Sequence, residues 1–499
     1  MNIYTSENIR DIDSYAEKVL NIPTERLMER AGRAIADEAV KLCSSGSEVL
    51  ILAGKGNNGG DGYAAAVCLM DKYNVKICDI FSLGQSSDAG KHFLNTYLGK
   101  GGVLVDPSSL SGHIAEADLI IDAVFGVGFR GDIPEWLLSV AKEVNRSTAR
   151  VLAVDMPLGV YSDTAETASV PIRADVTVAL TGLKPCHLSY PSAEVVGRIA
   201  TDRLGLDEHL SSVPTEIKYR TVDAHLAAEL LPKRAKTSNK GSFGRSLHFT
   251  GSSEYPGAAH LSLEGALRTG VGYVCHVGRK ELNIELRGKF PEALYVDTDD
   301  IIDPVSRISS YSSVLVGCGS GVSEETYLLC KSLIQSEGGA LVLDADAINS
   351  IAKFSSPDIL LSSGRKLILT PHPLELSRLF GITPRQINSS RISVAEEIAK
   401  KYGIILLLKG AGTVITDGER TFINSTGSSA LAKAGSGDVL SGIISSLVAT
   451  EGDLLSLVAL AAYLHGRAAD ELSADLSEYG VIPSDLPRRV ARIIADVLR

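Results

Sequence analysis

Short apolar segments alternate with helical patterns along almost the whole chain, and this alternation limits the possible folds more than any other feature. The apolar segments of the first half are EVLILA, NVKICDI, GVLV, DLIID, RVLAVD and DVTVAL. Those of the second half are SLHFT, YVCHV, SVLVG, ALVLD, KLILT, IILLLK, TVIT and TFI. Near-continuous apolar strands are typical of parallel sheets that helices cover on both faces. The alternation therefore predicts an α/β fold with doubly wound sheets.

The pattern loosens between Gly205 and Lys240, where the sequence is mostly polar and ends in a basic cluster. A chain of 499 residues is too long for one ordinary hydrophobic core. We therefore expect two domains, 1–215 and 216–499. No fixed-period repeat relates the two halves, so we expect two different domains.

The composition excludes several classes of protein. A net charge of −11 argues against binding to nucleic acid or to anionic membranes. The seven cysteines include no C-x-x-C pair, which favours a reducing compartment. The N-terminus lacks the apolar stretch of a signal peptide, and the longest apolar runs are too short to span a membrane. We expect a soluble cytoplasmic protein that forms a homo-oligomer, whose size the sequence does not give.

The segment AGKGNNGGDGY, Ala53 to Tyr63, contains G-x-G-x-x-G between a strand and a helix. That pattern is the dinucleotide fingerprint of dehydrogenases. Its polar residues Asn57, Asn58 and Asp61 are unusual there, because the fingerprint needs mainly small residues. The loop is therefore compatible with a phosphorylated ligand other than a hydride carrier.

A second glycine loop, DAVFGVGFRGD, follows another predicted strand and runs from Asp122 to Asp132. Asp122 and Asp155 both end strands, at the edge where open α/β sheets bind ligands. Such residues can also simply cap the turns that follow. Together with Asn58 and two loops suited to anions, they predict a site for a hard cation beside a phosphorylated ligand.

The four segments AGKGNNGGDGY, DAVFGVGFRG, AVDMPLGV and TGLKPCHLSYPSAEVVG resemble the signatures of the NAD(P)H-hydrate epimerase domain. The resemblance covers nearly all of residues 1–215. It implies a three-layer Rossmann-like fold, epimerisation at C6 of hydrated NADH or NADPH, and a bound potassium ion. The hydrate-binding residues that it implies are Asn57, Asn58, Gly59, Gly60, Asp61, Gly126, Val127, Gly128, Phe129, Arg130, Gly131, Asp132 and Asp155.

Within this resemblance Asp155 contacts the altered nicotinamide ring and is our candidate acid–base group. Asn58 and Asp122 would bind the potassium. The chain departs from the family at Leu158, where the family has a serine that helps to ligate the ion, and at Cys186, where it has glycine. The first departure removes a side-chain oxygen from the expected ion site.

In the second half, AKAGSGDVLSG is the strongest local motif. Gly435, Ser436 and Gly437 open a predicted helix, so their amides would face an anion. Asp438 follows in the first turn, where a carboxylate can accept a hydroxyl proton during phosphoryl transfer. The same sequence pattern also occurs where a glycine-rich turn simply precedes a helix that has an aspartate in its first turn, without any catalytic role.

Three other segments support a nucleotide-dependent site. LKGAGTVITD places the residues from Lys409 to Thr413 in a tight glycine turn after a strand. LTPHPLEL places His372 at a strand end, between two prolines that stiffen the loop. VLDADAIN supplies Asp344 and Asp346, of which Asp346 is either a supporting acid or only a turn former.

The G-S-G-D motif resembles that of the ribokinase-like superfamily, and the motifs as a set are similar to ADP- or ATP-dependent NAD(P)H-hydrate dehydratase over about residues 230 to 499. The resemblance implies dehydration of the S-hydrate with nucleotide hydrolysis, for which we expect Mg²⁺. The implied nucleotide-binding residues are Lys409, Gly410, Ala411, Gly412, Thr413 and Gly437. The implied hydrate-binding residues are Ala258, Gly319, His372 and Asp438, with Asp438 as the base.

The sequence thus predicts a bifunctional repair enzyme, with an epimerase in its N-terminal half and a dehydratase in its C-terminal half. Two departures, Leu374 for a family glycine and GCGSG for G-P-G-L-G, leave the polar residues in place. A vitamin or sugar kinase remains an alternative, as does an N-terminal half that binds a nucleotide or a protein without catalysis. The choice between ADP and ATP, the choice between NADH and NADPH hydrates, and the base of the epimerase stay open.

Overall fold

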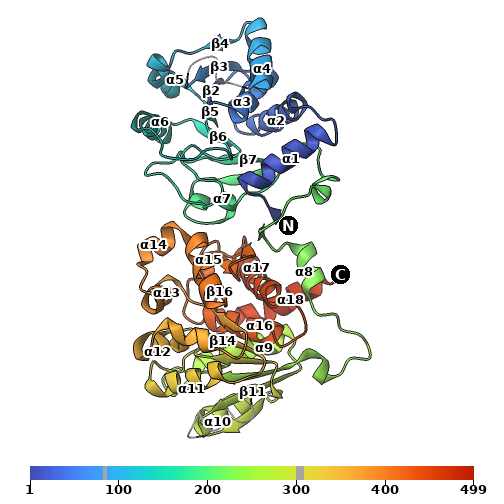
Figure 1. Cartoon of the computed structure of the whole chain (residues 1–499), viewed down its shortest axis with the longest axis vertical. Coiled ribbons are helices and arrows are strands. Elements are labelled where there is room, and N and C mark those ends of the chain that lie inside the picture. Colours follow the sequence, from blue (N-terminus) through green and yellow to red (C-terminus); the bar gives the residue numbers. More distant parts are fainter. Residues whose placement is uncertain (82–86, 299–307, 309) are drawn as a thin grey trace. The chain divides into compact units, whose positions relative to one another are not determined.

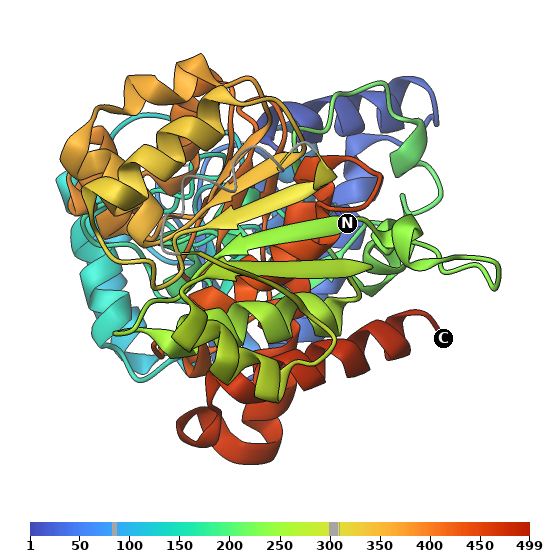
Figure 2. The ribbon, with the colours of Figure 1, turned by 90° about the horizontal axis from the view of Figure 1, so that it is seen from below.

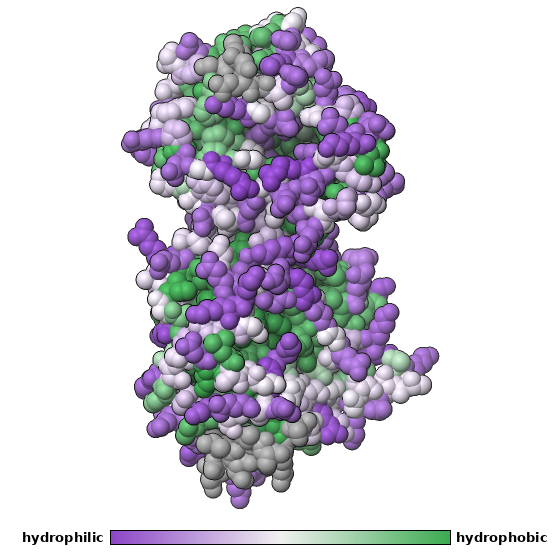
Figure 3. All heavy atoms as spheres, viewed as in Figure 1, coloured by the Kyte–Doolittle hydropathy of each residue, from purple (hydrophilic) through white to green (hydrophobic). Residues whose placement is uncertain are grey.

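The computed structural model describes residues 1–81, 87–298, 308 and 310–499, and it confirms the predicted α/β class. The chain divides into two compact units, an N-terminal unit of Asn2–Tyr219 and a C-terminal unit of Arg220–Arg499 together with Met1 (Figure 1). On the face that Figure 3 shows, hydrophilic residues are spread over both units. Within the described ranges, no helix is long and apolar enough to cross a membrane.

The sheet of the N-terminal unit is parallel and has the order β4-β3-β2-β5-β6-β7-β8. The strand order reverses between β2 and β5, and such a reversal leaves a crevice for ligands at the carboxyl edge. All six strands predicted for this half are present, whereas the half-exposed β8 was not predicted. The strands of this sheet are β2 Glu48–Ala53, β3 Asn74–Asp79, β4 Val103–Leu104, β5 Leu119–Ala123, β6 Arg150–Val154, β7 Val176–Leu180 and β8 Arg198–Asp202, and the short strand β1 Asn2–Ile3 is not part of it.

Helices cover both faces of this sheet (Figure 1). Val49 and Ile51 of β2 pack in one core with α1 to α4, while Leu50 and Leu52 pack in a second core with α5 and α6. This split explains why the strand is apolar throughout, because alternate side chains point to opposite faces. The helices are α1 Ser6–Lys18, α2 Thr24–Ala39, α3 Asn57–Leu69, α4 Asp88–Gly99, α5 Leu110–Glu116, α6 Glu135–Arg146 and α7 Pro185–Leu188.

The sheet of the C-terminal unit contains the order β18-β17-β16-β15-β14-β13-β10-β11-β12. Its strands are parallel from β16 to β12, whereas β17 and β18 are antiparallel (Figure 2). Here too the order reverses, between β10 and β13. The strands are β9 Tyr219–Arg220, β10 Arg245–Phe249, β11 Tyr273–Gly278, β12 Leu294–Asp297, β13 Ser313–Val316, β14 Ala340–Leu343, β15 Leu367–Leu369, β16 Ile405–Leu408, β17 Val414–Thr416 and β18 Thr421–Ile423.

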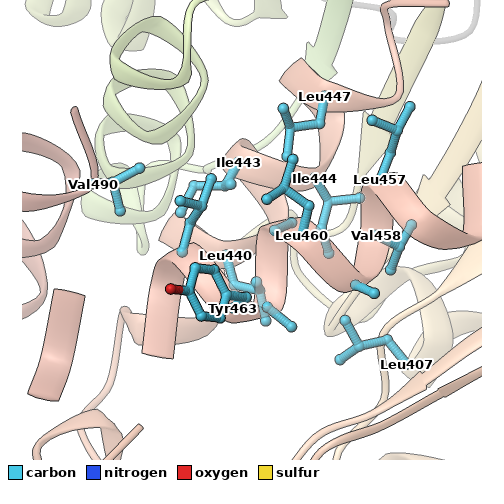
Figure 4. Packing of buried hydrophobic residues seen from close by; sticks show 14 of the residues in the cluster. Leu407, Leu440, Ile443, Ile444, Leu447, Leu457, Val458, Leu460, Tyr463 and Val490 are labelled. Atoms are coloured by element: carbon cyan, nitrogen blue, oxygen red, sulfur yellow. The ribbon is translucent and has the colours of Figure 1, made fainter. Parts of the chain in front are cut away.

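The core of this unit centres on one buried helix, α16. Ile443, Ile444 and Leu447 of α16 pack with Leu457 and Val458 of α17, as Figure 4 shows. This packing fixes the N-terminus of α16, which carries the predicted catalytic motif. The helices are α8 Ala224–Leu230, α9 Pro256–Thr269, α10 Lys280–Lys289, α11 Glu324–Gln335, α12 Asp346–Phe354, α13 Pro373–Phe380, α14 Pro384–Ser389, α15 Arg391–Tyr402, α16 Ser436–Leu447, α17 Leu454–Gly480 and α18 Leu486–Val497.

Candidate active sites

The three glycines of the first fingerprint allow two loops to touch at the crevice of the N-terminal unit. A Cβ on Gly54 would lie 1.8 Å from the Val124 carbonyl oxygen, and one on Gly59 would lie 2.1 Å from the Gly54 carbonyl oxygen. Gly56 has a φ of 80°, which side chains disfavour. The glycines therefore bring the loop after β2 against the loop after β5, where the strand order reverses.

A cavity of about 670 Å³ opens at this crevice. Some predicted residues line it and others do not. The predicted residues that line it are Asn57, Asn58, Asp61, Gly126, Val127, Gly128, Phe129 and Asp155. Gly59 and Gly60 instead pack inside the unit, and Arg130, Gly131 and Asp132 lie on the exposed end of their loop.

Asp155 forms a buried ion pair with Lys184, a residue that the sequence reasoning missed. The Lys184 ammonium contacts Asp155 Oδ1 and donates to the Leu180 carbonyl at 2.5 Å. Lys184 is 1% exposed. Asp155 has a φ of 65°, a strained backbone conformation that is more common at functional sites than elsewhere. The position of this lysine in the segment GLKP, just after a predicted strand, was the one sequence feature that could have indicated its place in the site.

His187 holds the backbone of Asp155. The Lys184 amide donates to His187 Nδ1 at 3.1 Å, so the ring proton is on Nε2, which donates to the Asp155 carbonyl at 2.7 Å. Burial and the charge of Lys184 lower the pKa of His187 to about 4. The imidazole is therefore neutral near pH 7 and serves to position Asp155.

Two further carboxyl groups line the same cavity. Burial raises the pKa of Asp13 to about 6. Burial, together with the charges of Asp155 and Asp13, raises the pKa of Asp61 well above its ordinary value. The raised pKa favours the protonated form of Asp61, whereas Asp155 is paired with Lys184. Such a set can both donate and accept protons. Asp13 lies in α1, outside every motif, so the sequence offered no indication of it.

The expected potassium site keeps Asn58 and Asp122 but lacks the serine oxygen, because Leu158 stands in that position. Both oxygens of Asp122 already accept amide hydrogens, from Val124 at 3.2 Å and from Leu158 at 2.6 Å. The Leu158 side chain is fully buried in an apolar cluster, where it offers no oxygen. Asn58 Nδ2 is buried without a partner among the described residues, so this N–H donor is available to an anionic oxygen.

In the C-terminal unit the predicted base lies at the N-terminus of α16. Gly435, with a φ of 100°, caps the helix. Oxygens of Asp438 and Asp344 and the Cys318 sulfur lie within 4.8 Å of one another. Burial and the charge of Asp344 raise the pKa of Asp438 to about 6. Asp438 is thus poised to titrate close to physiological pH, as a general base should.

Lys409 connects the predicted nucleotide loop with this helix. Its Nζ contacts Asp344 Oδ1 at 2.7 Å and Glu375 Oε2 at 3.9 Å, and it lies 3.5 Å from where a Cβ on Gly437 would be. Burial disfavours both charges, but their contact keeps the pKa of Lys409 raised and that of Asp344 lowered. The structure therefore places the lysine of the loop beside the amides that open α16.

His372 caps α13. Its Nδ1 accepts the amides of Leu374 and Glu375 at 3.1 and 3.3 Å, so Nε2 bears the proton and lies 3.3 Å from Glu375 Oε1. The side chain is still 44% exposed. Burial raises the pKa of Glu375 to about 6. Glu375 belongs to the motif LTPHPLEL but was not singled out from the sequence.

The predicted hydrate residues Ala258 and Gly319 meet where the strand order reverses. A Cβ on Gly319 would lie 2.7 Å from Ala258 Cβ. Asp346 accepts the Gly321 amide at 2.9 Å, a contact that a turn-forming aspartate makes. A cavity of about 560 Å³ opens at this edge, and Pro256 and Ser320 line it, but none of the predicted hydrate-binding or nucleotide-binding residues does.

Comparisons with known proteins find relatives that match both halves of the chain. A family model described as NAD(P)H-hydrate dehydratase matches residues 248–493, and one described as YjeF-related protein N-terminus matches residues 24–186. A bifunctional NAD(P)H-hydrate repair enzyme of Moorella thermoacetica is 32% identical over 97% of this chain and 95% of its own. One from Escherichia coli is 30% identical over 99% and 94%.

Two solved structures are similar to the C-terminal unit. The ADP/ATP-dependent NAD(P)H-hydrate dehydratase of Bacillus subtilis, crystallised with ATP and Mg²⁺, is 28% identical with a TM-score of 0.50 and covers 56% of this chain and 98% of its own. A ribokinase-like superfamily protein of Enterococcus faecalis, 23% identical with a TM-score of 0.51, covers 57% and 98%. The second likeness concerns the fold alone.

Proposed function

The chain belongs to the family of bifunctional NAD(P)H-hydrate repair enzymes, and from that premise we propose how its two sites divide the work. The N-terminal unit interconverts the R and S hydrates of NADH and NADPH, and the C-terminal unit dehydrates the S hydrate with ADP or ATP. One shared observation carries the proposal. Each unit sets a buried strand-end aspartate against a lysine, beside a glycine loop where its strand order reverses.

In the N-terminal site, the loops at Asn57–Asp61 and Gly126–Gly128 would hold the phosphates of the hydrate, and the ring would lie near Asp155. Phe125 and Phe129, stacked at 3.9 Å, supply an aromatic wall of the cavity. Protonation of the C6 hydroxyl lets water leave as the N1 lone pair moves toward C6. Water that returns to the opposite face inverts C6 and gives its proton to a carboxylate on that face. Asp61, whose pKa is raised, suits the role of the acid, and the ion-paired Asp155 suits that of the base.

In the C-terminal site, Lys409 to Thr413 and Gly437 would hold the nucleotide, with Mg²⁺ arriving on its phosphates. Ala258, Gly319 and His372 would line the hydrate. Asp438 accepts the proton of the C6 hydroxyl while the hydroxyl oxygen attacks the terminal phosphorus, whose bond to the bridging oxygen breaks and releases ADP from ATP or AMP from ADP. The C6–O bond then breaks, phosphate leaves, and loss of a proton from C5 restores the dihydropyridine. Phosphorylation in this way replaces hydroxide, a poor leaving group, by phosphate, a good one.

The test uses the full chain with mixed NADH hydrates, Mg²⁺ and either ADP or ATP. Absorbance of the reduced nicotinamide should recover until both epimers are consumed. No recovery with either nucleotide would overturn the dehydratase assignment. A stable phosphorylated product would point instead to a small-molecule kinase.

For potassium, we propose that any binding at Asn58 and Asp122 is weak in this chain, because Leu158 replaces a ligand. Epimerisation rate and melting temperature should differ little between KCl and choline chloride at equal ionic strength. The Leu158→Ser variant restores a hydroxyl and should gain potassium-dependent stabilisation. A wild-type protein that potassium alone activates or stabilises would contradict this proposal.

A further inference from the structure

Arg391 is a buried guanidinium that the proposed mechanism does not use. It is 4% exposed and is the first residue of α15. Its Nη2 donates to the carbonyls of Leu408 and Lys409 at 3.1 and 3.0 Å, and its Nη1 lies 3.5 Å from Asn388 Oδ1. Its Nε has no partner. Among the residues that the structure describes, no carboxylate pairs with it.

This placement is unfavourable for an isolated protein. A buried cation without a counterion is strongly destabilising, and the N-terminus of a helix carries positive partial charge. Burial lowers the pKa of Arg391 to about 10, which reflects the same cost. Hydrogen bonds to two carbonyls offset only part of the cost of burying this charge. An anion that binds nearby would offset the rest.

The two carbonyls that Arg391 holds belong to the start of the predicted nucleotide loop. Leu408 ends β16 and Lys409 begins the loop. A Cβ on Gly410 would lie 2.9 Å from Arg391 Nη2, so the guanidinium lies directly against the loop backbone. In a trans peptide the carbonyl and the following N–H point in opposite directions. With the Lys409 carbonyl turned toward Arg391, the Gly410 amide points away from it and can face a phosphate.

We propose that Arg391 is a positioning residue for the nucleotide: it holds the loop from Lys409 to Thr413 in its phosphate-binding shape and gives that loop positive potential. The inference rests on the proposed role of this loop. It predicts an effect on the binding of the nucleotide and little effect on the binding of the hydrate.

Arg365 provides a matched control within the same unit. It is 8% exposed, donates through Nε to the Gly339 carbonyl at 2.8 Å, and also has no carboxylate partner among the described residues. It precedes β15, at the amino end of the strands, whereas ligands bind at the carboxyl end. Its removal should therefore affect stability without affecting nucleotide binding.

The experiment compares Arg391→Met, Arg391→Lys and Arg365→Met with the wild-type full chain. The measurements are kcat, the KM values for ATP, ADP and S-hydrate, and the melting temperature with and without nucleotide. Arg391→Met should raise the nucleotide KM by about 10-fold or more and the hydrate KM by less than about 2-fold, since charge-assisted bonds of this kind are lost. Arg391→Lys should raise the nucleotide KM by about 3-fold, because an ammonium cannot match the planar fork. Arg365→Met should leave it unchanged.

An unchanged nucleotide KM in both Arg391 variants would overturn the inference. So would an equal rise in Arg365→Met, which would indicate general destabilisation. If Arg391→Met does not fold, Arg391→Lys decides the question. A wild-type protein without dehydratase activity would overturn the proposed function instead, and the nucleotide-induced shift in melting temperature would still test Arg391.

Discussion

At the scale of single residues, the two sites use the same device. Lys184 is held by Asp155 in the N-terminal unit, and Lys409 is held by Asp344 in the C-terminal unit. All four side chains are mostly or fully withdrawn from water, so each charge depends on its partner. Removal of one partner leaves the other as an uncompensated buried charge, which typically costs about 3–5 kcal/mol.

Asp155→Asn tests this device in the N-terminal unit. We expect epimerisation to fall by at least about 100-fold, because an amide can neither take up a proton nor balance Lys184. Chromatography that separates the R and S hydrates measures the rate at which they interconvert. The control is Asp175→Asn, which disrupts a partly exposed ion pair with Arg150 at 2.6 Å outside the cavity. Epimerisation that survives in Asp155→Asn would exclude Asp155 as the acid–base group.

The pH dependence of dehydration tests Asp438. Its pKa is raised to about 6, and a base works only when it is ionised. The rate at saturating substrate should therefore rise with pH through about 6 and level off above it. A single-turnover series from pH 5 to pH 8 would follow this rise. A rate that is flat, or that falls as the pH rises toward 7, would refute the assigned base.

At the scale of elements, the position of Asp438 depends on the close packing of α16 against α9. A Cβ on Gly442 would lie 2.1 Å from the Ser262 carbonyl oxygen, and one on Gly265 would lie 2.7 Å from the Val439 carbonyl oxygen. These two glycines let the helix backbones touch. The buried side chains of α16 on its other sides then hold the helix against α17 and the sheet.

Gly442→Ala should force the two helices apart. We expect a loss of about 1–3 kcal/mol in the free energy of unfolding, as for other overpacked cores. Denaturant unfolding of the full chain measures this loss. The unfolding transition of the C-terminal unit is identified as the one that moves when nucleotide is added. Gly288→Ala in α10 is the control, because a Cβ there meets nothing within 4 Å and should be neutral or slightly stabilising. Equal stability of the two variants would argue against the contact.

At the scale of the whole molecule, the chain combines two units with separate cores and separate sites. Hydration produces both epimers, and the proposed C-terminal reaction consumes only one. The N-terminal unit would return the other epimer to the pathway. The expected self-association of the chain stays a prediction.

Mixing two variants that each lack one activity tests this division of the reactions between the two units. Asp155→Asn should lack epimerisation and Asp438→Asn should lack dehydration, yet an equimolar mixture should restore NADH from both epimers, because the hydrate can diffuse between molecules. Recovery of the reduced nicotinamide absorbance measures it. A mixture no better than Asp155→Asn alone would show that the hydrate must stay on one molecule or that the roles are wrongly assigned.

The sequence by itself determined most of the strands, the glycine loops and the family, whereas β1, β8, β9 and β12 were not predicted. Parallel strands such as EVLILA bury both faces and therefore read as continuous apolar runs, and Gly54 and Gly59 stand where backbones touch. These features depend on neighbouring residues, so a short stretch of sequence is enough to predict them. The division after Tyr219 falls in the loosely patterned stretch where a boundary was expected.

Only the tertiary structure decided which charges meet. Asp13 comes from a helix before the first long strand, Lys184 follows β7, and Arg391 begins a helix that contacts the predicted nucleotide loop. Their convergence depends on strand order and on burial, which no local pattern encodes. The same burial raises the pKa of Asp61 and of Asp438, which favours acid–base chemistry by carboxyl groups that look ordinary in the sequence.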